Sequence, residues 1–505
     1  MSEPGHAERA EEPMPKGATE TGIAAFVRTD SASGKSRLSL RTALAMVAAV
    51  FVASRILFYR LEIYYWGYNQ SYLQMLDPEM LTGHLWQSLF YLHAQPPALN
   101  LIAGLALKWF PLNHPAAMSW PWKAMGFATA AAMLVLMCDL ALPVWLALLV
   151  TIVFMLSPES VLYENWFYAT YPSICLLALG AMSLARFLRG GRFGWGVAFL
   201  GLIALLIVAN SSFQLVWFVA ALVILNLAAP RRMAPLRRAS VIIGLLIAAL
   251  YLKNWVLFGS FSTSSWFGMN LASMSTAHDD FGDRERLVKD GTLSHSALIV
   301  PFSKLSDYGP GVAAPLTGIR ALDVASKADG SINFNNLAYV KLAQQYGKDA
   351  RWIILHRPRV YLASLETTFT NQLQPASDYG ILDTNRGRIV WWNRIYDRAL
   401  LVRPAGEVSI SLVFLVGFPL LWASSIVWLW RDYKTRGTLG VEGLVILFMT
   451  STILYVTAVA IFLNFTENDR LRAPIDPYYL VLATFLGYRL AHFLIERRKP
   501  STTDA

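Results

Sequence analysis

The chain has 505 residues, of which 55% are hydrophobic and only 15% are charged. Soluble domains are usually about 45–50% apolar and about 25% charged, so this composition excludes an ordinary soluble protein. The net charge of +10 does not indicate a nucleic-acid partner, because most Lys and Arg residues lie in short clusters beside apolar segments, where they orient membrane helices. The two cysteines, Cys138 and Cys175, form no metal-binding or disulfide pattern.

Residues 1–38 mix Glu, Ala, Gly, Ser and Lys without apolar periodicity, which predicts a disordered cytoplasmic tail rather than a signal peptide. Beyond them lie apolar segments near the length of about 20 residues that a membrane-spanning helix needs. The candidate spans are 40–59, 91–110, 122–139, 142–157, 168–187, 193–209, 212–228, 239–257, 408–430, 440–463 and 476–494.

This pattern predicts an all-α polytopic membrane protein with about 10–11 transmembrane helices. An N-terminal membrane module covers 39–257, a mixed polar region covers 258–407, and C-terminal helices cover 408–494, before a second cytoplasmic tail at 495–505. The polar region is too long for a simple connection, so we expect it to be partly folded and functional. Helical patterns cover Leu337–Tyr346 and Arg351–Phe369, and the apolar residues of the second are expected on one face of an interfacial helix.

Clusters of Lys and Arg mark the cytoplasmic ends of the helices. They occur at 35–41, 186–192, 231–238, 431–436 and 497–499, which places four stretches outside: 60–90, 158–167, 258–407 and 464–475. An inside N-terminus and an outside 258–407 region need an odd number of crossings between them, but the sequence offers eight candidates. One of them is therefore not a full span. The sequence leaves open whether this is 91–110, which opens with Gln95-Pro96-Pro97, or the short segment 142–157.

The first outside loop carries one group of candidate site residues. A carboxylate at a membrane-facing cleft can accept a proton from an attacking hydroxyl, so Asp77 and Glu79 are candidate catalytic residues. His93 and Gln95, just before the next apolar segment, are candidates for substrate binding. Two structural alternatives stay open. Asp77 can cap a short helix with Pro78 at its first position, and His93 can be a structural histidine.

A second group lies at 163–172, where aromatic and polar residues alternate. Glu164 and Tyr168 are candidates for substrate binding, because a carboxylate at a helix mouth costs desolvation energy unless it faces water or a partner. Such residues suit stacking on a sugar or contact with lipid. The alternative is that the aromatic residues belong to the belt found at every bilayer interface.

A third group lies at 464–474, between two apolar segments. Arg470 and Arg472 are predicted to lie outside, although Lys and Arg residues usually lie on the cytoplasmic side. Guanidinium groups match the oxygens of a phosphate. They are candidates for phosphate binding, with Asn468 as a candidate substrate contact. The alternative is that they form salt bridges with Glu467 and Asp469. Further polar residues are candidates for lining the site: Asn333, Asn335, Asn336, Asp378, Asn385, Arg386 and Arg388.

Together these loops resemble the GT-C glycosyltransferases, especially the family 39-like branch of protein O-mannosyltransferases and aminoarabinose transferases. Asp77 matches the acidic position of the first outer loop, and Gln95-Pro96-Pro97-Ala98 matches a Pro-Pro helix start. Arg472-Ala473-Pro474 resembles the arginine-containing outer loop before a terminal helix. The resemblance spans the membrane region, but its motifs are short. The chain departs from it in having Pro78 between its two first-loop carboxylates, and the 258–407 region matches no acceptor-specific domain.

The resemblance implies an inverting transfer of a sugar from a polyprenyl-phosphate donor to a glycan, lipid or protein acceptor outside the cytoplasm. Asp77 would be the general base, and Arg472 with Arg470 would stabilise the leaving phosphate. No cofactor is required, although a divalent metal is compatible with such an enzyme. The expected location is a bacterial inner membrane, with the site facing the periplasm. The alternatives are a lipid or glycan transporter or flippase and a non-catalytic scaffold.

Overall fold

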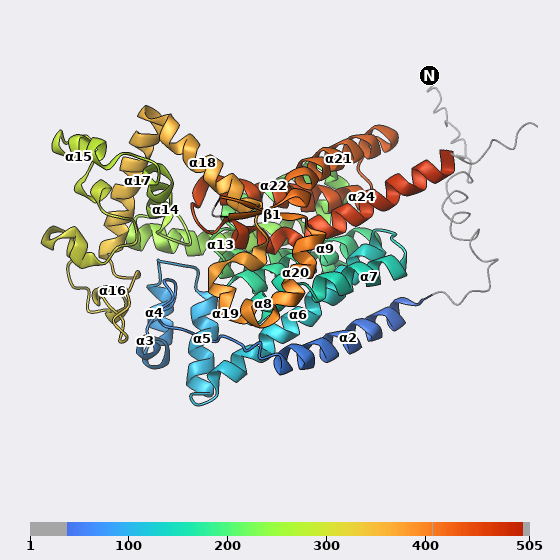
Figure 1. Ribbon diagram of the computed structural model, residues 1–505, viewed down its shortest axis with the longest axis horizontal. Helices are drawn as coiled ribbons and strands as arrows, with labels where there is room; N and C mark the ends of the chain where they lie inside the picture. Colours follow the sequence, from blue (N-terminus) through green and yellow to red (C-terminus); the bar gives the residue numbers. More distant parts are fainter. Residues whose placement is uncertain (1–37, 407, 498–505) are drawn as a thin grey trace, which may run out of the picture. The chain divides into compact units, whose positions relative to one another are not determined.

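A computed structural model of the chain describes residues 38–406 and 408–497, and the described residues from Leu40 onward form one compact unit (Figure 1). The membrane segments and the 258–407 region are thus parts of a single body. The predicted N-terminal tail falls outside the described residues except for its last residue. Residues 498–505 of the predicted C-terminal tail also fall outside them, while its first residues belong to the last helix.

Seven helices of the described chain are long and apolar enough to span a membrane, which confirms the prediction of an all-α, multi-pass membrane protein. Two of them begin with a short additional helix, α12 (Pro230–Met233) before α13 and α23 (Asn468–Arg472) before α24. The seven are α2 (Leu40–Arg60), α6 (His114–Asp139), α9 (Thr170–Gly190), α13 (Arg237–Phe258), α21 (Leu412–Arg436), α22 (Val441–Leu463) and α24 (Asp476–Arg497).

Three further apolar segments complete the bundle. The helices α7 (Val144–Met155) and α8 (Pro158–Glu164) form a pair bent by 57°, the geometry of a broken span or a re-entrant loop. The helix α10 (Phe193–Ala209) ends beside the start of α9. There the Asn210 amide donates to the Ser173 hydroxyl at 3.0 Å. The helix α11 (Leu215–Ala228) then returns, and Arg237 donates to Asn226 near its end.

The 91–110 segment contains a helix that is short for a membrane span. Its helix α5 (Ala98–Trp109) has 12 residues, about 18 Å at 1.5 Å per residue, against a hydrocarbon core of about 30 Å. The starts of α5 and α6 both lie near the segment that follows α2, since the Leu76 N–H donates to Asn100 and Gly67 packs against Pro115.

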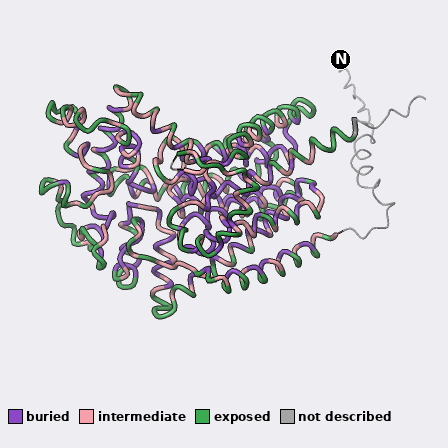
Figure 2. The backbone as a smooth tube through the Cα atoms, viewed as in Figure 1, coloured by how far each residue is buried: buried purple, intermediate pink, exposed green. Residues whose placement is uncertain are grey.

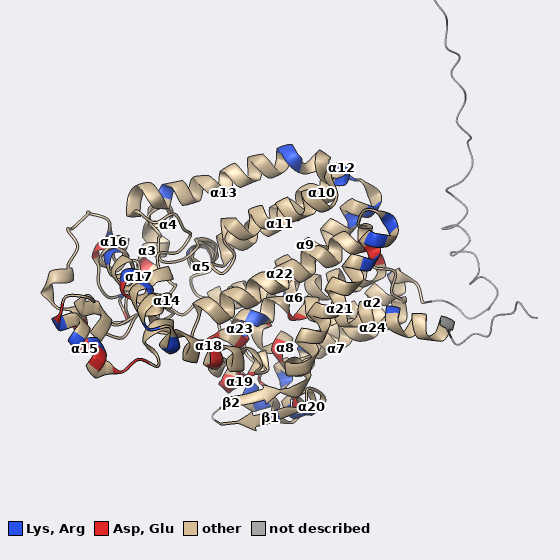
Figure 3. Cartoon of the chain, turned by 90° about the horizontal axis from the view of Figure 1, so that it is seen from above, with Lys and Arg blue, Asp and Glu red and all other residues tan. Residues whose placement is uncertain are grey.

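The bundle has two chemically different ends. At one end, here called the basic end, Arg186 pairs with Asp139 at 2.7 Å and Arg489 pairs with Glu442 at 2.8 Å. Figure 3 shows Lys and Arg residues gathered at this end around α12. The opposite end, here called the loop end, carries the segments that join α2 to α6, α8 to α9, α13 to α21 and α22 to α24. These segments include the short helices α3 (Pro78–Gly83) and α4 (Leu85–Phe90).

The 258–407 region is a folded helical layer with its own core. Trp266, Met269, Phe334, Tyr339 and Tyr346 are buried together in it. Figure 2 shows buried and exposed residues close together in this part of the molecule. The strands β1 (Val402–Ala405) and β2 (Val408–Ser411) pair antiparallel at its end. Its helices are α14 (Phe267–Thr276), α15 (Phe281–Lys289), α16 (Arg320–Asp323), α17 (Ala338–His356), α18 (Pro358–Gln372), α19 (Asp383–Arg386) and α20 (Val390–Ala399).

The prediction of one helix over Arg351–Phe369 is wrong. The helix α17 ends at His356 and α18 begins at Pro358, because proline lacks an N–H and disfavours helical backbone in the residue before it. The predicted apolar face is divided as a result. Ile353 is fully buried against Leu293, whereas the side chain of Leu355 is 76% exposed.

Candidate functional site

Four segments meet at the loop end of the bundle. The first and second are joined by backbone hydrogen bonds, from the Trp66 N–H to the Asn165 carbonyl at 2.8 Å and from the Phe167 N–H to the Trp66 carbonyl at 2.7 Å. The Tyr163 hydroxyl donates to the Ala376 carbonyl at 3.0 Å, which attaches the third segment. The fourth, between α22 and α24, is attached to the third by a hydrogen bond between side chains, described below. Stretches far apart in the chain thus share one surface.

Four aromatic side chains form the centre of this surface and are here called the aromatic cluster: Tyr72, Trp166, Tyr168 and Tyr379. The rings of Trp166 and Tyr168 are stacked, with centroids 4.2 Å apart and planes 10° from parallel. Tyr72 meets both rings edge-on, and the Trp166 indole N–H donates to its hydroxyl at 2.9 Å. Tyr379 packs on Trp166 with centroids 5.8 Å apart. Each of the first three segments contributes at least one ring.

A single cation lies against the aromatic cluster. The guanidinium carbon of Arg470 is 4.7 Å from the centroid of Tyr168 and 5.7 Å from that of Tyr379. Arg470 pairs with Glu467 at 2.5 Å, and the Tyr379 hydroxyl donates to the same carboxylate at 2.6 Å. The Arg470 Nε is buried and has no hydrogen-bond partner among the described residues. Arg470 therefore retains an unused donor.

Burial and the Arg470 charge act together on the pKa values of the neighbouring groups. Burial alone would raise the pKa of Glu467, but Arg470 and the Tyr379 hydroxyl stabilise the carboxylate and the net effect lowers it. Burial raises the pKa of Tyr168 to about 12, although Arg470 opposes the shift. At neutral pH the site thus contains a carboxylate, a guanidinium and protonated phenols.

An open pocket of about 400 Å³ adjoins the aromatic cluster. It is lined by Trp66, Gly67, Tyr68, Asn69, Gln70 and Tyr72. Tyr72 belongs to both the pocket and the aromatic cluster. On the other side, the Tyr68 hydroxyl donates at 2.5 Å to the carbonyl of Leu76, the residue before Asp77. The pocket therefore lies between the aromatic cluster and the segment that carries Asp77.

Asp77 is the N-cap of α3, as the structural alternative for this residue stated. One carboxylate oxygen accepts from the Glu79 N–H at 3.0 Å and the other accepts from the Ala328 N–H at 2.6 Å. Its side chain is buried, and the turn around Ala328 covers it. Beside it, the Lys327 amine donates to the Gln70 and Tyr72 carbonyls at 2.6 and 2.9 Å, and burial lowers the pKa of Lys327 to about 8. Capping and a proton-accepting role are compatible, because each oxygen keeps a second lone pair.

Glu79 and Gln95 lie apart from the aromatic cluster. Glu79 is exposed and pairs with Arg320 at 2.7 Å on the outside of α3. Gln95 is half-buried, and its side chain forms no hydrogen bond with the rest of the described chain. The side chain of neither residue is joined by a hydrogen bond or ion pair to Asp77 or Arg470 within residues 38–406 and 408–497.

His93 has the properties of the structural histidine that was the alternative to a site residue. It is buried, its Nδ1 lies 2.9 Å from the Ser265 hydroxyl, and its Nε2 lies 3.0 Å from the Asn335 carbonyl. Burial lowers the pKa of His93 to about 3, with the Asn335 carbonyl opposing the shift and Lys253 adding to it. His93 therefore fastens the first outer segment to the 258–407 region as a neutral imidazole.

Lowering the pH from 7.5 to 4.5 will destabilise the protein by about 2–3 kcal/mol through His93 alone. The unfolded chain binds a proton on histidine near pH 6.5, whereas the folded protein does so only near pH 3, so stability is lost as the pH falls below 6.5. Thermal unfolding at both pH values measures the effect. The variant His93→Gln should lack this component and His84→Gln, at an exposed position, should keep it. Equal pH dependence in wild type and His93→Gln would contradict a neutral buried His93.

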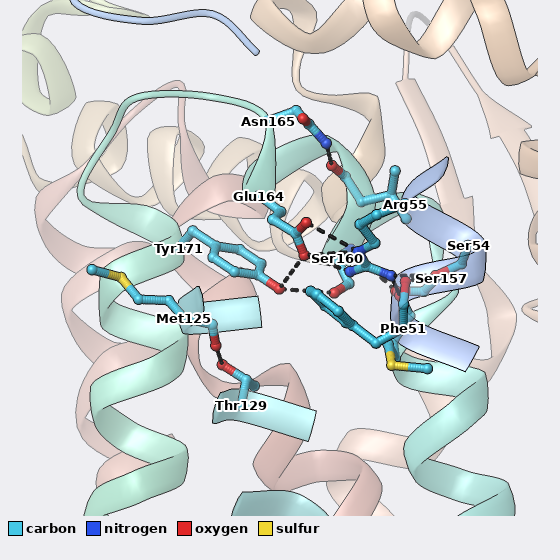
Figure 4. A network of polar contacts seen from close by, with 12 residues as sticks. Phe51, Ser54, Arg55, Met125, Thr129, Ser157, Ser160, Glu164, Asn165 and Tyr171 are labelled. Atoms are coloured by element: carbon cyan, nitrogen blue, oxygen red, sulfur yellow. Dashed lines mark hydrogen bonds and ion pairs between the residues drawn. The ribbon is translucent and has the colours of Figure 1, made fainter. Parts of the chain in front are cut away.

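Glu164 lies inside the bundle rather than in the aromatic cluster. Its carboxylate accepts from the Arg55 guanidinium at 3.0, 3.2 and 2.5 Å, and the Tyr171 hydroxyl donates to it at 3.3 Å (Figure 4). The side chain of Glu164 is 0% exposed and that of Arg55 is 9% exposed. The desolvation cost of the carboxylate is thus offset by a partner on α2, and not by contact with water.

Arg472 and Asn468 are also engaged in structural contacts. Arg472 is fully buried, pairs with Asp476 at 3.0 Å, and donates to the Gln374 carbonyl at 2.7 Å and to the Gln372 carbonyl. The Asn468 amide donates to the Ala460 carbonyl at 2.5 Å and to the Asn464 carbonyl at 2.9 Å, which satisfies the end of α22. Of the two candidate arginines, Arg470 is the one that meets the aromatic cluster.

Several residues of the site did not stand out in the sequence as site residues. Tyr72, Trp166 and Tyr379 are unremarkable aromatic residues of a chain with 21 Tyr and 17 Trp, and Glu467 was considered only as a salt-bridge partner. Their proximity depends on contacts between distant segments. The polar residues of the 258–407 region mostly anchor this region, since Arg386 pairs with Asp378 and the Asn385 amide donates to the Tyr64 carbonyl.

Within residues 38–406 and 408–497, no three His, Cys, Asp or Glu side chains are grouped in a way that would hold a metal ion. The sequence matches no known protein-family model and no curated protein. The fold and the loop-end surface define the chain as a multi-pass, α-helical membrane protein with an aromatic, arginine-containing candidate site between its loop-end segments.

Proposed function

We propose that this chain is a membrane glycosyltransferase that moves a sugar from a polyprenyl-phosphate donor to an acceptor, with inversion at the anomeric carbon. The observation that carries the proposal is the aromatic cluster around Arg470 beside an open pocket of about 400 Å³ at the loop end. Pockets that bind small molecules combine apolar or aromatic walls with a few polar groups that fix orientation. The loop end then faces the outside, because the Lys and Arg clusters mark the opposite end as cytoplasmic.

The aromatic cluster and Arg470 have complementary roles in this proposal. A phosphate is bound well by a guanidinium group, since its oxygens accept parallel N–H bonds. Arg470 has one free donor at Nε, and a donor phosphate would compete with Glu467 for the others. The accessible parts of the half-buried Tyr168 and Tyr379 side chains would contact the sugar or the first units of the lipid. A positive charge fixed near the breaking bond stabilises the leaving phosphate in the transition state.

Asp77 is the general base of the proposal. The acceptor hydroxyl oxygen forms a bond to the anomeric carbon, the bond from that carbon to the phosphate oxygen breaks, and the bonding electrons leave with the polyprenyl phosphate. The hydroxyl proton goes to the Asp77 carboxylate. Because Ala328 covers Asp77, the turn Lys327–Ser331 has to move before an acceptor can reach the carboxylate. Acceptors of three kinds, a glycan, a lipid or a protein, are compatible with this chemistry.

The substitution Asp77→Asn will strongly reduce sugar transfer while keeping the cap of α3. Asparagine keeps one side-chain oxygen for the Glu79 N–H, loses the oxygen that accepts from the Ala328 N–H, and cannot accept the proton. The test incubates purified wild type and Asp77→Asn with radiolabelled polyprenyl-phosphate sugars and an extract of a bacterial envelope, and measures transferred label. Removal of a general base reduces the rate by about 10²–10⁴-fold. Transfer by Asp77→Asn at the wild-type rate would exclude Asp77 as the base.

A lipid or glycan transporter is the second candidate, and one structural observation favours it. Glu159 and Asp476 interact with each other beside Arg472 where two helices of the bundle begin. Ionisable residues within the membrane helices of transporters often mark a path for protons or substrate. If the wild type transfers no sugar from any donor but moves labelled lipid across proteoliposomes, the transporter replaces the glycosyltransferase. A non-catalytic scaffold predicts neither activity.

A further inference from the structure

A second pocket lies on the lateral surface of the bundle, where α2 ends and α6 begins. Its volume is about 130 Å³, roughly tenfold the space that one water needs. It is lined by Arg55 and Phe58 of α2, by Tyr65 just after α2, and by Ser119 and Lys123 of α6. None of these residues belongs to the aromatic cluster or to the 400 Å³ pocket.

The two cations that line this pocket differ in their partners. Arg55 is saturated, because Glu164 takes one edge of its guanidinium and the Met155 carbonyl accepts from Nη1 at 3.0 Å. Lys123 is half-buried and forms no hydrogen bond or ion pair with any described residue. Its ammonium lies 5.9 Å from the centroid of the Tyr65 ring. The nearby carboxylate of Glu164 is already neutralised by Arg55, so the pocket carries one uncompensated positive charge.

Tyr65 adds a second unsatisfied group. Its hydroxyl is buried and has no hydrogen-bond partner among the described residues. Buried hydroxyl groups nearly always have a partner, and each exception calls for an explanation. An ammonium and a hydroxyl that both lack acceptors, in one pocket, call for a ligand that is anionic and has several acceptor oxygens.

The position of the pocket identifies the environment of this ligand. The surrounding surface consists of exposed apolar side chains of the spanning helices, since Ile56, Tyr59 and Trp120 are 59%, 66% and 72% exposed. In a bilayer this surface contacts lipid, and aromatic residues at such a level mark the boundary between headgroups and hydrocarbon. A lipid whose chains lie along this surface would place its headgroup phosphate at the pocket.

From these observations we propose that Lys123 and Tyr65 bind the phosphate of a membrane lipid at the junction of α2 and α6. The Lys123 ammonium would compensate the phosphate charge, and the Tyr65 hydroxyl would donate to one of its oxygens. The lipid chains would lie beside the exposed faces of α2 and α6. This site is separate from the proposed donor site at Arg470, and it does not rest on the proposed transferase activity. The two sources of such a phosphate are a glycerophospholipid and a polyprenyl phosphate.

Native mass spectrometry of the full-length protein tests the proposal. The purified protein is incubated with phosphatidylglycerol, and in a second arm with polyprenyl phosphate, and the retained lipid is titrated. We expect Lys123→Gln to weaken the tightest lipid binding by about tenfold and Tyr65→Phe by about fivefold, as for loss of a charged and a neutral hydrogen bond. Lys123→Arg should retain binding. The matched control is Lys108→Gln, which removes the same charge from an exposed lysine at the end of α5.

The two arms distinguish the source of the phosphate. Dependence on Lys123 with phosphatidylglycerol supports a structural phospholipid, and dependence with polyprenyl phosphate alone supports binding of a substrate or product lipid. Retention of both lipids by Lys123→Gln at wild-type affinity would overturn the proposal, as would an equal loss in Lys108→Gln. If Lys123→Gln fails to fold, Tyr65→Phe and Lys123→Arg carry the same test. Because no sugar transfer is measured, the outcome is independent of the glycosyltransferase proposal.

Discussion

Glutamine in place of Glu164 will lower the free energy of unfolding by about 3–5 kcal/mol, the usual cost of removing one partner of a buried ion pair. The pair joins α2 to α8, and the side chains of Glu164 and Arg55 are 0% and 9% exposed. Glutamine has nearly the same shape as glutamate, so packing against Gly126 is kept and the loss is electrostatic. The Arg55 charge would remain inside the bundle without a counter-charge. Unfolding in detergent, followed by tryptophan fluorescence, measures the change.

Two further variants separate the ion pair from other effects. The double variant Arg55→Met with Glu164→Gln removes both charges, and it should be more stable than Glu164→Gln alone, because no buried charge is left unpaired. The variant Glu79→Gln breaks the exposed pair with Arg320 and should change stability by less than about 1 kcal/mol. Wild-type stability of Glu164→Gln would show that the network in Figure 4 does not hold α2 against α8.

The substitution Arg470→Gln is expected to reduce the catalytic efficiency of sugar transfer by about 10²–10³-fold, as when one donor to a developing negative charge is removed. The proposal assigns to Arg470 the charge that stabilises the leaving phosphate. Arg470→Lys keeps a positive charge but lacks the planar pair of donors, so its efficiency should fall between those of wild type and Arg470→Gln. The ratio of kcat/KM values for label transfer measures the lost stabilisation of the transition state.

A control for stability is needed because Arg470 pairs with Glu467. Arg470→Gln leaves this carboxylate unpaired beside Tyr379, and the loss of activity then includes a loss of structure. The double variant Arg470→Gln with Glu467→Gln removes both charges, so no unpaired charge is left in the site. It should be folded and still inactive. Glu467→Gln alone should keep its activity, since Arg470 is then free to bind phosphate. Wild-type transfer by the double variant would contradict the role of Arg470.

The membrane helices were predictable from the sequence because a spanning helix depends on the length and composition of one continuous segment. The segments that became α2, α9, α13, α21 and α22 needed no knowledge of their neighbours. The segment 91–110 was ambiguous for the same reason. Its apolar residues pack against α3 and α6 at the loop end, and apolar composition alone does not distinguish burial in protein from burial in lipid.

The candidate site was predictable only in part. Tyr168 and Arg470 were both expected in the site, and the structure brings them together. The other candidates in the loop-end segments have polar side chains too: Asp77, His93, Glu164 and Arg472. The sequence alone does not show which residues form hydrogen bonds or ion pairs with them. These partners lie far away in the chain: Ala328 for Asp77, Asn335 for His93 and Arg55 for Glu164. Tertiary contacts determine which of these polar residues is left without such a partner.

The contacts that hold the first outer segment to the 258–407 region set an order of events during synthesis. Tyr64 is joined by hydrogen bonds to Asn385, 321 residues further along, and Glu62 pairs with Arg388, 326 residues further along. At roughly 5–20 residues per second, a ribosome needs about 16–65 s to add that length of chain. During this time the segment that follows α2 has been synthesised but lacks its contacts with Asn385 and Arg388. A chaperone or insertase that binds residues 61–77 in this interval would contact a different surface from any factor that recognises the folded protein.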